Sequence, residues 1–135
     1  MNLLISIKPE FVKKILAYEK LYEFRKSIFK QDVDKIFIYA TYPVKKIVGY
    51  FEVGEIICKS PVELWNLCSD GSGISKNDFF RYYANSKEGF AIKIDNLHLF
   101  DEFIDMSNYE DFKAPQSFCY VENNDFLREL LLIYL

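Results

Sequence analysis

Three charged side chains in residues 18–25 stand at a spacing that can build one polar site. They are Lys20, Glu23 and Arg25, in the run Tyr-Glu-Lys-Leu-Tyr-Glu-Phe-Arg. From Leu21 to Arg25 rings alternate with charges, the period-2 pattern of a half-buried strand. Glu23 and Arg25 therefore share one face, with Cα atoms roughly 7 Å apart, and can bind one ligand or pair with each other.

Lys20 joins this cluster only if the chain turns before the strand. By strict alternation its side chain would point with Tyr22 and Phe24, away from Glu23. We therefore expect residues 18–21 to form a loop. The alternative interpretation of the same triplet is a solvated strand face with an ordinary ion pair.

A buried lysine beside a carboxylate can carry acid–base chemistry. Burial lowers the pKa of an amine, so Lys20 could act as a base toward a water or nucleophile while Glu23 passes a proton to a leaving amine. The sequence contains no phosphate-binding P-loop, serine-nucleophile motif, HExxH motif or paired CxxC. We therefore expect neither a cofactor nor a metal.

The remaining reactive residue types predict a cytoplasmic protein without a catalytic thiol. His98 is the only histidine and stands between two leucines, so we interpret it as structural. The cysteines are odd in number and widely spaced, which fits reduced thiols: Cys58, Cys68 and Cys119. No window reaches the roughly 18 apolar residues that span a bilayer, and the N-terminus lacks the pattern of a signal peptide.

The charge distribution limits how this chain can contact nucleic acid. The net charge is −3, but residues 1–59 hold 11 Lys and Arg against 7 Asp and Glu, whereas residues 60–135 hold 6 against 13. Affinity for phosphates comes mainly from Lys and Arg through counterion release. Any nucleic-acid contact must therefore use a local basic patch in the first half.

Apolar periodicity predicts the elements that position the charged cluster. We expect strands at 3–7, 21–25, 35–41, 47–57, 89–94, 97–104 and 117–121, and helices after Pro9, Ser60 and Ser75 and at about 125–135. The strands 89–94 and 97–104 are predicted to form a hairpin through Asp95-Asn96. Many short strands with helices between them indicate one α+β domain over residues 1–135, with a curled sheet or partial barrel.

The C-terminal helix is apolar nearly all round. Phe126, Leu127, Leu130, Leu131 and Tyr134 define one face, and further apolar residues follow it. The helix must therefore dock on something. We favour the domain's own core over a homodimer contact.

The charged cluster resembles the family motif G-x-K-x-x-E-x-R of ASCH domains, which are PUA-like barrels. Lys20, Glu23 and Arg25 match the motif, and Tyr18 stands where the family has glycine. Similarity extends through residues 6–10, 35–55 and the closing segment Ala114-Pro115-Gln116-Ser117-Phe118, so the resemblance covers about residues 3–121.

This resemblance implies a small mixed β-barrel with helices packed around it and a cleft that binds RNA or a modified nucleobase or nucleoside. Some relatives are enzymes: an N4-acetylcytidine amidohydrolase and a ribonuclease. If this chain is such an enzyme, the resemblance implies that Lys20 and Glu23 are its catalytic pair. The residues that we expect to bind the ligand are Lys8, Lys20, Glu23, Arg25, Lys26, Gln116 and Ser117. A binding module, with a regulatory role as one option, is thus our first hypothesis. A small hydrolase is the second, and a protein-interaction module using the C-terminal helix is the third.

Overall fold

The computed structural model describes residues 1–135 and contains six strands and four α-helices. The strands are β1 (Leu3–Ile7), β2 (Tyr22–Arg25), β3 (Lys35–Ala40), β4 (Lys46–Lys59), β5 (Gly89–Asp105) and β6 (Phe118–Tyr120). The helices are α1 (Pro9–Leu16), α2 (Pro61–Cys68), α3 (Lys76–Tyr82) and α4 (Asp125–Leu130). None of the helices has both the length and the apolar character needed to cross a membrane.

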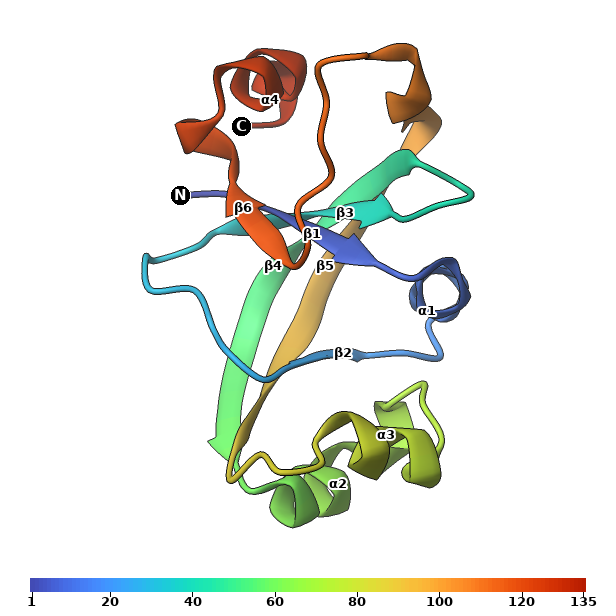
Figure 1. Cartoon of the computed structure of the whole chain (residues 1–135), viewed down its shortest axis with the longest axis vertical. Coiled ribbons are helices and arrows are strands. Elements are labelled where there is room, and N and C mark those ends of the chain that lie inside the picture. The colour runs from blue at the N-terminus through green and yellow to red at the C-terminus, as the bar shows by residue number, and fades with distance from the viewer.

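All six strands form one mixed sheet in the order β2-β5-β4-β3-β1-β6. β1 and β3 are parallel, and the other neighbours are antiparallel. The long strands β4 and β5 run from one end of the molecule to the other, with α2 and α3 at one end and α4 at the other (Figure 1). The expected α+β fold with helices around a curled sheet is confirmed, and the sheet is a half-barrel whose edges are β2 and β6.

The predicted hairpin at Asp95-Asn96 is wrong, because residues 89–105 form the single strand β5. Asn96 takes a left-handed φ of 46°, and the register with β4 shifts between Tyr50 and Glu52. Such a bulge bends a strand without reversing it. The Asn96 side-chain amide donates to Glu52 Oε2 at 2.7 Å across the bulge. The connection between β4 and β5 is instead the helical insertion of residues 60–88.

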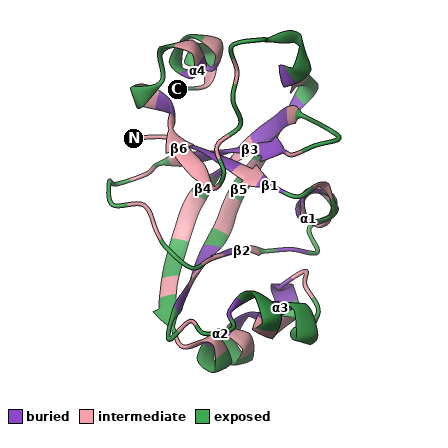
Figure 2. Ribbon diagram, viewed as in Figure 1, coloured by how far each residue is buried: buried purple, intermediate pink, exposed green.

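Three apolar clusters hold the elements together. One packs α1 against the sheet through Val12 and Ile15, and another joins α2 and α3 to β2 and β5 through Leu64, Phe79 and Phe24. Figure 2 shows that buried residues are concentrated where β1, β3 and β4 cross. The charged cluster therefore lies between two separately packed bodies, α1 on one side and the insertion on the other.

The C-terminal segment packs on the domain's own core. Leu127 and Leu131 are fully buried in the third cluster, beneath the same sheet. Helix α4 ends at Leu130, and a 3-10 turn follows it at Leu132–Tyr134. Ile133 remains 84% exposed. A homodimer through this exposed strip stays a prediction.

Candidate functional site

The end of α1 turns Lys20 toward the interior. The helix ends at Leu16, and Tyr18 takes a left-handed φ of 58°. The amides of Glu19 and Lys20 both donate to the carbonyl of Lys14, at 2.9 and 3.1 Å, so they cap the last turn of the helix. β2 begins only at Tyr22, as the expected loop at 18–21 requires. Tyr18, which occupies the position of the motif's glycine, thus redirects the chain after α1 into the loop that leads to Lys20.

Tyr18 does not obstruct the site. A tyrosine adopts the left-handed conformation less readily than glycine and could narrow the mouth of the cleft, yet here it takes that conformation and leaves the mouth open. The residue adopts the left-handed conformation, its side chain is 66% exposed, and it does not line the cavity described below. The turn can hold this conformation because backbone hydrogen bonds fix it on both sides.

Lys20 is a buried lysine, with 4% of its surface exposed. Its Nζ donates to the carbonyl of Ser72 at 3.0 Å and lies 4.7 and 5.4 Å from the ring centroids of Phe24 and Phe11. Burial away from water lowers the pKa of Lys20 below its ordinary value of 10.5; Glu23 partly opposes this shift, whereas Arg25 adds to it.

The loop at residues 71–73 holds Lys20 from the insertion side. The amide of Leu21 donates to the carbonyl of Gly71 at 2.8 Å, and Lys14 Nζ donates to the carbonyl of Gly73 at 3.0 Å. Gly73 has a φ of 65°, and a Cβ there would lie 2.6 Å from Lys20 Cβ. The sequence predicts a turn at 70–73, but its contact with Lys20 exists only in the folded chain.

Glu23 and Arg25 form a partly buried ion pair on one face of β2, as alternation predicted. Glu23 Oε1 lies 3.5 Å from Arg25 Nε. The other two nitrogens of the guanidinium donate to Ser117 Oγ at 3.1 Å and to the carbonyl of Ser6 at 2.9 Å. Arg25 thus ties β2 to β1 and to the segment before β6. Lys20 takes part in none of the ion pairs of the structure.

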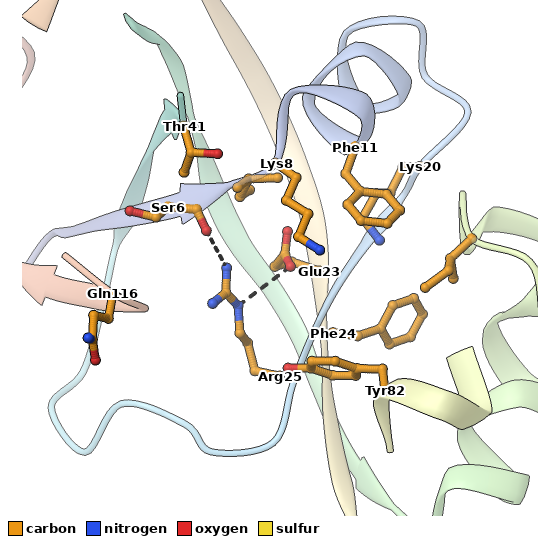
Figure 3. Close-up of a pocket in the computed structure, with 12 residues that line it drawn as sticks. Ser6, Lys8, Phe11, Lys20, Glu23, Phe24, Arg25, Thr41, Tyr82 and Gln116 are labelled. Carbon is orange, nitrogen blue, oxygen red and sulfur yellow. Dashed lines mark hydrogen bonds and ion pairs between the residues drawn. The ribbon is translucent and has the colours of Figure 1, made fainter. Parts of the chain in front are cut away.

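These side chains surround one open cavity of about 380 Å³. Figure 3 shows the charged groups of Lys8, Glu23 and Arg25 facing the same space as the rings of Phe11, Phe24 and Tyr82. The lining residues come from β1, α1, β2, the insertion and the segment before β6: Ser6, Ile7, Lys8, Phe11, Lys20, Glu23, Phe24, Arg25, Thr41, Ile74, Tyr82 and Gln116. Polar groups that converge in a ring-lined hollow are the usual features of a small-molecule site.

The structure brings most of the residues singled out from the sequence to this cavity, though their binding roles remain predictions. Lys8 and Gln116 are exposed lining residues. Ser117 reaches the site through Arg25. Lys26 does not line the cavity; its Nζ lies 4.9 Å from the ring centroid of Tyr82.

Sequence reasoning missed the cavity residues that come from other elements. Phe11 has the spacing of an ordinary apolar residue of α1, and Thr41 follows a buried strand but belongs to no recognisable motif. Tyr82 lies on the insertion helix α3 among other aromatic residues, so the sequence alone does not distinguish it from the rings that pack in the core. No group of three or more His, Cys, Asp or Glu side chains is arranged to hold a metal, and His98 stacks on Tyr50 at 4.9 Å between ring centroids.

Solved structures with the same architecture identify the fold. The crystal structure of ASCH from Zymomonas mobilis aligns with a TM-score of 0.84 and 24% sequence identity, over 98% of this chain and 94% of that chain. The chain has the fold of an ASCH domain. A crystal structure of a single-substitution variant of the same protein aligns equally well, with a TM-score of 0.84 at 23% identity and coverage of 98% and 95%. The fold that the motif resemblance implied is therefore confirmed.

Sequence relatives of this ASCH-fold chain are of several kinds. An ASCH domain-containing ribonuclease from Zymomonas mobilis is 31% identical over 88 residues, which is 64% of this chain and 60% of that protein. ATP synthase subunit alpha and large ribosomal subunit protein uL22 from Ureaplasma parvum are 27% and 26% identical over 122 residues. The chain spans 15% and 39% of the length of those two proteins. No family model matches the chain.

Proposed function

We propose that this ASCH-fold domain binds RNA, or a modified nucleobase or nucleoside, in the cavity around Lys20, Glu23 and Arg25, and that it does so in the cytoplasm. The observation that carries the proposal is the convergence of these three charged residues and three aromatic rings on one hollow. Its volume of about 380 Å³ lies in the range of roughly 300–1,000 Å³ typical of small-ligand pockets.

The two kinds of lining group match the two parts of a nucleobase. Aromatic side chains stack on the flat face of an unpaired base, whatever its sequence. Charged and polar groups such as Glu23 and Gln116 can hydrogen-bond to its edge. Lys8 and Lys26 are exposed near the cavity and can contact the phosphates of the same strand.

A binding titration tests the proposal. Fluorescence anisotropy with labelled single-stranded RNA at low salt should show saturable binding by the wild-type domain. Lys8→Gln should weaken this binding two- to tenfold, because it removes a cation from the cavity rim. Lys87→Gln, which removes an exposed lysine that does not line the cavity, should bind as the wild type does. Absence of binding at low salt would overturn the proposal.

A hydrolase acting on a modified nucleoside or on RNA is the second candidate, favoured by the state of Lys20. A lysine whose pKa is lowered by burial acts as a base more readily than an exposed lysine, and Glu23 lines the same cavity. One relative carries the name ribonuclease. Turnover on a panel of N4-acylated cytidines and RNAs, lost in a folded Lys20→Ala variant, would support this candidate. No turnover on the whole panel would remove it and leave the binding function standing.

A further inference from the structure

One buried oxygen in the cavity has no hydrogen-bond partner. Glu23 is 7% exposed, its Oε1 faces Arg25 Nε at 3.5 Å, and its Oε2 accepts no hydrogen bond. Glu23 Oε2 and Arg25 Nε are the only buried side-chain nitrogen or oxygen atoms without such a bond. Leaving a buried acceptor unpaired is unfavourable, and more so when it is charged, so native structures nearly always supply a donor.

The donors that surround Glu23 make no hydrogen bond to Oε2, and Arg25 Nε, itself without a hydrogen-bond partner, forms its ion pair with the other oxygen, Oε1. Lys20 Nζ donates to the carbonyl of Ser72 and forms no ion pair with Glu23. The two terminal nitrogens of Arg25 donate to Ser6 and Ser117. None of these groups is hydrogen-bonded to Oε2, so a ligand in the cavity can supply the donor that this oxygen lacks.

We propose that the cavity selects planar ligands that donate an N–H hydrogen bond to Glu23 Oε2. This inference rests on the proposed function, since it specifies which edge of a base enters the cavity. Tyr82 and Phe24 flank the same space as Glu23 (Figure 3), so a ring packed against them can direct its edge at the carboxylate. A base whose inserted edge carries an amino or imino N–H is accepted, and one without such a donor is rejected.

The arrangement predicts a specific effect of Glu23→Gln. The guanidinium of Arg25 lies 3.5 Å from Oε1 through Nε, which carries only a donor, so the amide oxygen of the glutamine will occupy that position and its NH₂ will take the place of Oε2. The cavity then presents a donor where it had presented an acceptor. Sites built to hydrogen-bond a ligand group discriminate strongly against analogues that lack it, because buried polar atoms are left unpaired.

The test compares wild type with Glu23→Gln, and for each protein it compares a nucleoside with its N-methylated analogue. Calorimetric titrations with adenosine, cytidine, guanosine and uridine identify the nucleosides that bind wild-type protein. Each binder is then compared with the N-methylated analogue that lacks the edge N–H groups, such as N4,N4-dimethylcytidine or 3-methyluridine. We expect methylation to weaken binding to the wild type at least tenfold, and to weaken binding to Glu23→Gln much less.

The comparison separates hydrogen bonding from steric exclusion, because a steric clash would cost the same in both proteins. Glu102→Gln, an exposed change outside the cavity, should reproduce the wild-type values. Equal losses in wild type and Glu23→Gln would overturn the donor inference while leaving the binding function intact. Absence of binding by every nucleoside and by single-stranded RNA would overturn both. If Glu23→Gln does not fold, tight binding of the methylated analogues to the wild type still refutes the inference.

Discussion

Lys20 lies in an environment that is unusual for a lysine. It is buried against two rings, and the pKa of its ammonium is lowered mainly because burial removes water. In the unfolded chain the pKa returns to about 10.5. Between the lowered value and 10.5 the unfolded state binds more protons than the folded state, so this group makes stability rise with pH in that window.

This linkage gives a prediction for Lys20→Met. The variant lacks the buried amine, so the difference between its free energy of unfolding and that of wild type should change with pH. We expect wild type to gain stability relative to Lys20→Met as pH rises from 7 toward 10, measured by urea unfolding. Lys87→Met, at an exposed site, should show no such change. Parallel curves for wild type and Lys20→Met would contradict the buried state of the amine.

Tyr18 gives a second prediction at the scale of a single residue. A non-glycine residue in the left-handed region carries a steric cost of roughly 1–2 kcal/mol, and Tyr18 has a φ of 58° there. Tyr18→Gly should therefore raise the free energy of unfolding by about 1 kcal/mol. Tyr18→Ala retains the Cβ and should not produce this gain. Thermal unfolding of both variants is the measurement, and a gain of equal size in both would show that backbone strain is not its source.

At the scale of elements, the crossing of β4 and β5 depends on Gly49. A Cβ at this position would lie 2.2 Å from the carbonyl oxygen of His98, a backbone atom that cannot rotate away. The register between the two strands shifts on both sides of this point. The close approach lets the two long strands bend together, and they carry the insertion that closes the cavity.

Gly49→Ala should therefore destabilise the domain by more than about 2 kcal/mol, since backbone has to move. The matched control is Gly54→Ala on the same strand. There the added Cβ would meet only the carboxyl group of Asp95, whose side chain can turn aside. Chemical denaturation should show a loss below about 1 kcal/mol for this control. Equal losses at the two glycines would mean that β4 tolerates no added methyl group anywhere.

At the scale of the whole molecule, the acidic balance of the chain limits how it can hold RNA. The net charge is −3, and only Lys8 and Lys26 are exposed cations at or beside the cavity among the residues proposed to bind. Single-stranded binding loses affinity with salt at a slope of about 0.7 for each phosphate neutralised. We expect a plot of log affinity against log salt to have a slope smaller than about 2 in magnitude. A slope of 5 or more would place the main contact on a different, more basic surface.

Much of the site could be predicted from the sequence because its central residues are neighbours in the chain. The alternation of Tyr22 to Arg25 depends only on strand geometry, and it placed Glu23 and Arg25 on one face before any tertiary contact was known. The motif resemblance added Lys20 and the closing segment with Gln116 and Ser117. The hairpin prediction at Asp95-Asn96 was wrong because a left-handed asparagine serves equally well in a turn or in a bulge, and only pairing with β4 decides between them.

The sequence by itself determined the period of each strand, the loop before β2 and the local basic character of the first half. These properties arise from residues a few positions apart. Only the tertiary structure decided that Ser72 and Gly73 hold Lys20, that Ser6 and Ser117 hold Arg25, and that Tyr82 faces Glu23 across the cavity. Those contacts join distant segments, and they depend on how the half-barrel curls and on where its insertion packs. The unpartnered oxygen of Glu23 follows from the same packing, because burial and the positions of all neighbouring donors together leave it without a partner.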